Sequence, residues 1–137
     1  MAQQVHYVRF QGVEPHPAGH RPGIFVLVNG LSRDGRLTAE QEHFRRTSNA
    51  WYDAAYTNPS HVDTAVYDRA VNPGAVAWFR HTSHELIARV EGYLDILTAH
   101  SVPWERLSSA DPGRVVYEDE HQIVVVPHPP AAGPLAR

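Results

Sequence analysis

Cysteine and lysine are both absent from this chain of 137 residues. Without cysteine the protein has no disulfide bond, no thiol nucleophile and no thiolate ligand for a metal. Without lysine it cannot form a Schiff base, and all 12 of its basic residues are arginines. No serine lies in a recognisable nucleophile motif, so any catalysis is expected to be acid–base rather than covalent. The sequence leaves open whether the protein is an enzyme.

The chain also lacks a strong charge bias and a long apolar run. Its formal net charge is -3 at pH 7, without the basic face or stripe that is typical of nucleic-acid binders. The segment Met1–His6 has neither the basic region nor the apolar stretch of a secretory signal, and no later segment is long enough to span a bilayer. We therefore expect a cytoplasmic protein with no nucleic-acid partner and no membrane partner.

The length fits one domain, which at about 150 residues buries near 70% of its surface and needs no disulfide to fold. We expect this single domain to cover residues 1–127. Residues 128–137 are rich in proline and alanine and offer few groups to bury, so they are expected to form a flexible tail.

The hairpin between Pro112 and Pro127 is the clearest predicted element. Two short runs rich in valine and isoleucine are joined at an acidic tip, and proline bounds the segment at both ends. If Tyr117 and Gln122 face each other across a tight loop, both faces of the strand pair are apolar at the base. A strand pair covered on two sides belongs inside a sheet, so we expect this hairpin at the sheet's centre.

Three further strands are expected. Residues 5–10 alternate between two faces as a strand does, and a long loop of residues 11–23 follows them. The continuous apolar run Ile24–Val28 favours a strand that is buried on both faces. Residues 104–108 form the last of the three, directly before the hairpin.

Helices are expected between the second and third strands. Thr38 and Gln41 have the spacing of a capping box, which predicts a helix from there to about Tyr56. A second cap at Ser60 predicts a short helix to about residue 70. An apolar stripe at helical spacing predicts a long helix over residues 75–99, with a break near residue 81 as the alternative.

The predicted order is therefore strand, strand, three helical segments and three strands. A run of strands that is split by a helical block favours an α+β fold. We expect a mainly antiparallel sheet of about five strands, with the helices packed mainly on one of its faces.

Polar side chains near the expected sheet could form an anion-binding pocket. Arg33 and Arg36 lie in a connection that enters a helix, where unpaired N–H groups and guanidinium donors suit a carboxylate or phosphate. A solvated loop is the alternative interpretation. Tyr117 and Gln122 are expected within an apolar ladder, so they need partners, either each other or a ligand. These four residues, together with Arg9 on the first strand, are the five predicted ligand-binding residues.

The hairpin tip supplies a candidate for catalysis. Glu118 and His121 place a carboxylate near an imidazole, and such a pair can act in acid–base chemistry because each group shifts the pKa of the other. The alternative is that the charged tip is only solvated.

A metal site is a further alternative. On a continuous helix His81, His84 and Glu85 lie within one turn, a spacing that first-row divalent metals can use. A third or fourth ligand would have to come from elsewhere in the chain. A capping or surface cluster is the competing interpretation.

A short segment resembles a known family. The run Val115-Val116-Tyr117, with Gln122 five residues after the tyrosine, resembles the late strand pair of poly-ADP-ribose-polymerase-like ADP-ribosyltransferases. Arg9 is similar to the first-strand arginine of other ADP-ribosyltransferases. In the resembled family the catalytic glutamate lies two residues before the Val-Val-Tyr triplet, where this chain has Gly113, and the early histidine-glycine motif is missing. The resemblance implies a degenerate NAD-binding domain rather than an active transferase.

Aromatic residues are concentrated on two of the expected helices: Trp51, Tyr52, Tyr56, Trp78 and Phe79. They could pack in the core, form a stacking wall for a planar ligand, or form an exposed dimer surface. Our leading hypothesis is a pocket between the hairpin and the helices that binds a small anionic or aromatic ligand, with acid–base catalysis as an option. The alternatives are a non-enzymatic homodimer through the helical aromatics, the NAD-binding domain and a histidine-ligated metal protein. The cofactor is unknown.

Overall fold

Five antiparallel strands form one open sheet in the computed structural model, which describes residues 5–14 and 21–128. The strands are β1 (Tyr7–Gly12), β2 (Val76–Arg80), β3 (Trp104–Ser109), β4 (Gly113–Glu118) and β5 (Gln122–Pro127). Their order across the sheet is β3-β1-β2-β5-β4, and every neighbouring pair is antiparallel. The predicted α+β class, with about five mainly antiparallel strands, is confirmed.

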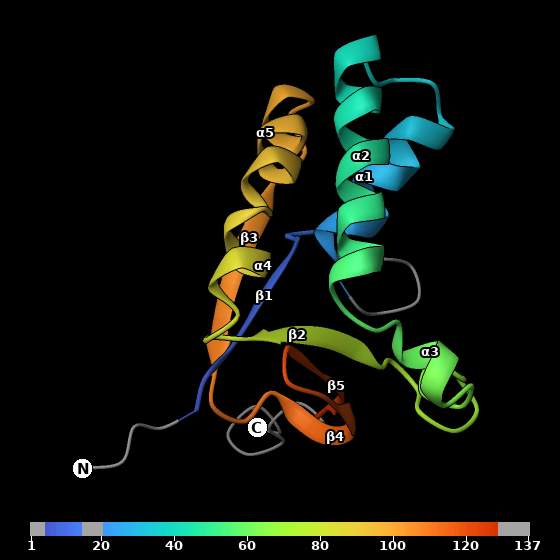
Figure 1. The fold of residues 1–137 in the computed structure, drawn as a ribbon, viewed down its shortest axis with the longest axis vertical. Coiled ribbons are helices and arrows are strands. Elements are labelled where there is room, and N and C mark those ends of the chain that lie inside the picture. The colour runs from blue at the N-terminus through green and yellow to red at the C-terminus, as the bar shows by residue number, and fades with distance from the viewer. Residues whose placement is uncertain (1–4, 15–20, 129–137) are drawn as a thin grey trace, which may run out of the picture.

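Three helices, α1 (Ile24–Arg33), α2 (Ala39–Ala55) and α5 (Glu91–Ala99), pack together over one face of the sheet (Figure 1). Two short helices, α3 (Pro59–Val62) and α4 (His84–Ala88), lie in the connections on either side of β2. Within the described ranges, no helix has both the length and the apolar character needed to cross a membrane.

The hydrophobic core lies between the sheet and the helices. Phe10 and Phe79 from the sheet belong to the same buried cluster as Val28 of α1 and Leu97 of α5. A second, smaller cluster lies on the opposite face of the sheet, around Trp78, and both faces of β2 and β5 are therefore buried. Burial on two faces explains why β5 is a nearly continuous apolar strand.

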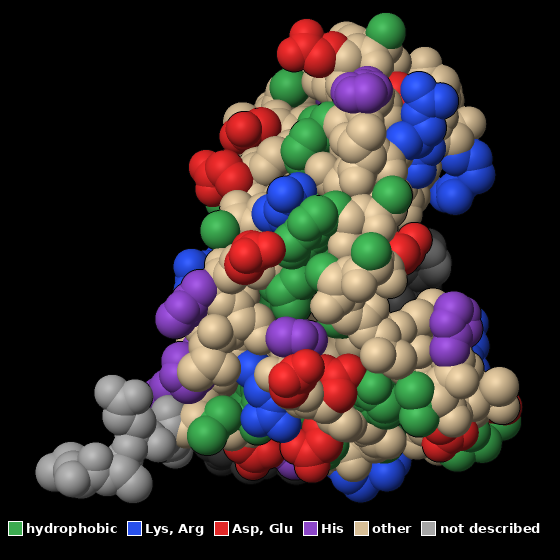
Figure 2. All heavy atoms as spheres, in the orientation of Figure 1, with side chains coloured by type: hydrophobic (Ala, Val, Ile, Leu, Met, Phe, Trp, Pro, Cys, Tyr) green, Lys and Arg blue, Asp and Glu red, His purple; other side chains and the backbone are tan. Residues whose placement is uncertain are grey.

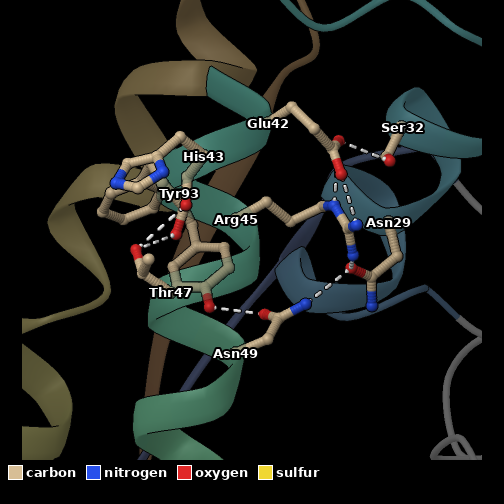
Figure 3. A network of polar contacts seen from close by, with 9 residues as sticks. Asn29, Ser32, Glu42, His43, Arg45, Thr47, Asn49 and Tyr93 are labelled. Carbon is tan, nitrogen blue, oxygen red and sulfur yellow. Dashed lines mark hydrogen bonds and ion pairs between the residues drawn. The ribbon is translucent and has the colours of Figure 1, made fainter. Parts of the chain in front are cut away.

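A chain of polar contacts ties the three main helices to one another (Figure 3). The Tyr93 hydroxyl on α5 donates to Asn49 on α2 at 2.6 Å, and the Asn49 amide donates to Asn29 on α1 at 3.1 Å. Arg45 also donates to Asn29 and pairs with Glu42. Hydrogen bonds that link three helices fix their relative positions more narrowly than apolar packing alone.

The apolar run at residues 24–28 is the beginning of α1, so the strand predicted there is wrong. Ile24, Val28 and Leu31 are buried at helical spacing, whereas Val26 is 61% exposed. A strand would place Val26 on the same face as Ile24 and Val28. Short apolar runs are ambiguous between strand and buried helix, and here the helix continues into a polar segment.

The single helix predicted over residues 75–99 is also wrong, and the alternative of a helix with a break near His81 is correct only in the break, because the residues before it form a strand. Residues 76–80 form β2, the central strand of the sheet, and the helices α4 and α5 follow it. Trp78 and Phe79 are both buried although they are adjacent, because they point to opposite faces of a strand that is covered on both sides. Val76 and Phe79 also fit the helical spacing of the apolar residues that follow them, which is why the sequence favoured a helix here.

The predicted hairpin exists as β4 and β5, but its place and register differ from the prediction. β4 is an edge strand, and the centre of the sheet is β2. Tyr117 pairs with Val124 rather than with Gln122, and a β-bulge between Val115 and Tyr117 shifts the register by one residue within the hairpin. A bulge adds one unpaired residue to one strand, so Val115 and Tyr117, which were expected on one face, lie on opposite faces: Val115 pairs with Val125 and Tyr117 with Val124.

The capping box at Thr38 is confirmed, since its hydroxyl accepts from Gln41 N and the Gln41 side chain accepts from Thr38 N. The end of α2 near Tyr56 is confirmed as well. The next helix begins earlier than predicted because Asn58 rather than Ser60 provides its N-terminal cap, and it ends at Val62, well before residue 70. The predicted tail, apart from His128, lies outside the described residues, and its flexibility stays a prediction.

Candidate functional site

The sheet opens between β1 and β2. All six residues of β1 pair with β3, but only Tyr7 and Val8 pair with β2. Beyond Val8 the segment that leads into α1 takes the place of β2, and Gly12 N donates to Pro22 O at 2.8 Å. A cavity of about 710 Å³ lies beside this opening.

Helices, loops and strands all line the cavity. They are the first turn of α1, the C-terminal half of α2, the segment before α3, the loop around Tyr67, and the strands β1, β2 and β5. The residues that matter most for chemistry are Arg9, Asp53, Tyr56, Tyr67, Arg69 and Gln122. Two of the predicted ligand-binding residues, Arg9 and Gln122, are therefore brought together at one cavity.

Arg9 is a buried cation, with 9% of its surface exposed. Its guanidinium donates to the Gln11 side chain at 3.0 Å, to Ala77 O at 2.9 Å and to Arg21 O at 3.2 Å. All three acceptors are neutral, and no carboxylate among the described residues forms an ion pair with it. Burial lowers the pKa of Arg9 to about 10, which leaves it protonated at neutral pH.

Gln122 is 3% exposed at the start of β5. Its amide nitrogen donates to Thr57 O at 2.8 Å and to Asp119 Oδ2 at 3.3 Å. The Tyr117 hydroxyl donates to the same Asp119 oxygen at 2.8 Å. The two polar residues that were expected to need partners thus share one carboxylate instead of contacting each other.

Asp119 is the acceptor at the hairpin tip. Burial alone would raise its pKa, but hydrogen bonds from the His121 N–H, the Tyr117 hydroxyl and Gln122 outweigh that effect. The pKa of Asp119 is consequently lowered, and the side chain is a carboxylate at neutral pH. A charged acceptor is well suited to hold the Gln122 amide in one orientation.

Two tyrosines complete the cavity wall. Burial, and next the neighbouring Tyr67 and the carboxylates of Asp53 and Asp119, raise the pKa of Tyr56 to about 12. Burial also raises the pKa of Tyr67, although Arg9 opposes that rise. Both phenols are therefore neutral at physiological pH and can donate hydrogen bonds. No periodic pattern surrounds Tyr67, and nothing in the sequence could have singled it out.

The remaining predicted residues lie outside the cavity. Arg33 and Arg36 are exposed at and beyond the end of α1. Glu118 pairs with Arg80 at 2.8 Å, and His121 Nε2 lies 3.4 Å from the Glu120 carboxylate. Neither of the residues predicted for acid–base catalysis lines the cavity.

The candidate metal ligands are not on one continuous helix. His81 precedes α4, and its ring nitrogen Nδ1 lies 3.1 Å from the His6 backbone nitrogen. In the part of the chain that the structure describes, no three histidine, aspartate or glutamate side chains are grouped so that they could hold a metal ion.

Gly113 cannot be replaced by a glutamate without a backbone change. A Cβ atom at this position would lie 2.3 Å from Val126 O on the adjacent strand. The backbone at position 113 thus leaves no room for a glutamate, the residue that the resemblance to ADP-ribosyltransferases would require there.

Comparison with protein-family models, with curated proteins and with solved structures finds no match for this chain. Its function therefore has to be argued from the cavity. The cavity offers two guanidinium groups, one carboxylate, two neutral phenols and an amide, together with aromatic walls, and this combination suits binding of a polar ligand with a flat apolar part.

Proposed function

We propose that the cavity binds a small ligand in which an anionic group is joined to a planar ring. The observation that carries this proposal is Arg9, a buried cation without a carboxylate partner among the described residues. Buried charges are normally paired, because the desolvation of an unpaired ion costs several kcal/mol. A carboxylate or phosphate of the ligand would supply the missing charge.

The first turn of α1 supports the same assignment. Gly23, Phe25 and Val26 line the cavity, and the α1 N-terminus has no side-chain cap. The N–H groups of a first helical turn have no acceptor within the helix, and the helix dipole favours negative charge there. Gly23 also lies against the guanidinium, since a Cβ at this position would be 3.4 Å from an Arg9 nitrogen.

Aromatic side chains support the second part of the proposal. Phe25 and Tyr52, both in the cavity wall, pack edge to face with ring centroids 5.0 Å apart. Tyr56 lies beside them, 6.0 Å from the Tyr52 ring. The volume of about 710 Å³ is within the range of about 300–1,000 Å³ that is usual for small-molecule sites.

NAD binding is a second candidate. Two of the polar residues in the resemblance to ADP-ribosyltransferases, Arg9 and Gln122, line the same cavity, whereas the third, Tyr117, lies outside it. NAD combines phosphates with two ring systems, so it belongs to the proposed ligand class. With glycine at position 113, binding without transfer is the expected outcome.

The homodimer stays a prediction. Figure 2 shows hydrophobic side chains gathered in a strip between α2 and the α4–α5 pair. Several of the helical aromatics are used internally, however: Tyr52 is 5% exposed, and the Arg89 guanidinium lies 4.0 Å from the centre of the Trp51 ring. The cavity contains polar groups without partners, and we therefore base the proposed function on the cavity rather than on this apolar strip.

Thermal-shift and calorimetric titration would test the proposal with AMP, NAD, benzoate and inorganic phosphate. We expect at least one ring-bearing anion to raise the melting temperature, and Arg9→Met to weaken its binding at least about tenfold. Arg33→Met removes the same charge outside the cavity and should leave affinity unchanged. Because Arg9 also holds β1 near β2, the wild-type protein should be titrated with adenosine as well. Equal binding of AMP and adenosine, or no shift with any compound, would overturn the proposal.

A further inference from the structure

We propose that Gln122 selects the ligand by accepting a hydrogen bond through its carbonyl oxygen from an N–H or O–H group on the ring. This inference rests on the proposed function, because it assigns the second polar contact of the same ligand. The predicted ligand class is therefore narrower: an anion at one end and a hydrogen-bond donor at the other.

The orientation of the Gln122 amide follows from its neighbours. Its Nε2 faces the Thr57 carbonyl at 2.8 Å and the Asp119 carboxylate at 3.3 Å. Both neighbours can only accept, so an amide turned the other way would place its oxygen against two acceptors. The nitrogen is fixed toward the protein, and the oxygen is left on the other side of the amide.

The Gln122 oxygen has no donor among residues 5–14 and 21–128. Gln122 is 3% exposed and lines the cavity. Its oxygen is not among the fully buried side-chain atoms that lack a partner, which in the described residues are limited to Trp78 Nε1, so it keeps access to water at the cavity. A ligand that brings a donor to this wall gains that hydrogen bond, and one that brings a C–H group forces the oxygen to lose its water.

Asp119 keeps the amide in this orientation. It receives hydrogen bonds from the backbone N–H groups of His121 and Gln122, and from the Tyr117 hydroxyl. These contacts hold the carboxylate at the hairpin tip just before β5, within reach of Gln122 Nε2. Tyr117 and Asp119 are accordingly positioning residues, and Gln122 is the residue that would contact the ligand.

The sheet topology separates the two ends of the ligand. Arg9 is on β1 and Gln122 is on β5, with β2 between them. Two strand spacings amount to about 10 Å between the backbones. An elongated molecule such as a nucleoside monophosphate, with its phosphate and its base at opposite ends, fits this arrangement better than a compact anion.

Matched probes that differ by one donor test the inference. AMP carries an amino group on its ring, and purine riboside 5′-monophosphate has hydrogen in its place; 4-aminobenzoate and benzoate form a shorter pair. In calorimetric titration of the wild-type protein we expect the amino member of a pair to bind about 10- to 100-fold more tightly. Gln122→Met should bind both members equally, with little change for the member that lacks the amino group.

Gln41→Met is the matched control, because Gln41 lies in the cap of α2 and outside the cavity. It should lower stability yet keep the preference for the amino member. Equal binding of both members by the wild-type protein overturns this inference. A preference for the amino member that persists in Gln122→Met also overturns it. Either result leaves the proposed function standing. If Gln122→Met fails to fold, the wild-type ratio alone decides. If none of the four probes binds, the proposed function fails and this inference fails with it.

Discussion

Polar side chains have partners within the protein in the helical layer, whereas several of those around the cavity do not. Between the helices, Tyr93, Asn49, Asn29, Arg45 and Glu42 form one connected chain, and each has a partner inside the protein (Figure 3). Around the cavity the charge of Arg9 has no anion, the Gln122 oxygen has no donor, and the phenols of Tyr56 and Tyr67 have no acceptor among the described residues.

This difference in pairing indicates that the polar groups of the helical layer contribute to stability and those of the cavity to binding. Polar groups that are paired inside the fold hold elements in place, and their loss destabilises the folded state. Polar groups that are left unpaired at a cavity add little to folding, and they can be paired by something from outside. Asn29 and Asn49 mark the boundary, because they line the cavity but use their side chains in the helical network.

The largest expected effect is on stability, in the helical layer. At Gly92 of α5 a Cβ atom would lie 2.1 Å from the Phe44 ring. Gly92→Ala should therefore lower the free energy of unfolding by about 1–3 kcal/mol, even though alanine favours helix. Adding Phe44→Leu should restore part of this loss. Denaturant titration measures both changes, and an unchanged midpoint for the single variant would show that the layer is less tightly packed than described.

A pair of tyrosines compares the two regions directly. Tyr93→Phe removes a hydroxyl bonded to Asn49 at 2.6 Å and should cost about 1 kcal/mol of stability. Tyr56→Phe removes a hydroxyl without an acceptor among the described residues and should change stability by less than about 0.5 kcal/mol. The ranking should reverse for ligand affinity, which only Tyr56→Phe is expected to weaken. Equal stability losses in the two variants would contradict the comparison.

The fold class could be predicted from the sequence because its local signals are strong. The capping box at Thr38, the proline after Asn58 and the valine-rich hairpin each depend on a few neighbouring residues. The two misassigned segments, Ile24–Val28 and 75–99, are those whose apolar runs fit either a strand or a helix. Only tertiary burial decides such cases, as the exposure of Val26 and the double burial of β2 demonstrate.

The candidate site was only partly predictable. Gln122 was identified as a polar residue in an apolar strand, where an unpaired group is costly, and Arg9 through its place on the first strand and its similarity to an arginine of ADP-ribosyltransferases. The other three predicted contacts lie elsewhere, since Arg33 and Arg36 are solvated and Tyr117 is bonded to Asp119. No local pattern could reveal that β1 and β2 separate after Val8, because this opening results from pairing between distant segments.

The smallest expected effect is on the pH dependence of stability, which should differ between the helical layer and the cavity. Hydrogen bonds from Arg45 and Ser32 lower the pKa of Glu42 from 4.5 to about 2 in the folded protein. A carboxyl whose pKa is lower when folded stabilises the fold above its unfolded pKa, and that contribution is lost as the pH falls toward the folded value. The stability difference between wild type and Glu42→Gln should thus be constant from pH 7 to about 5 and shrink from about pH 4.5 to 2.5. The corresponding difference for Arg9→Met should stay flat over the same range, because no carboxylate among the described residues pairs with Arg9. A loss in parallel with Glu42 would mean that Arg9 has an acidic partner within the chain and needs no anion from a ligand.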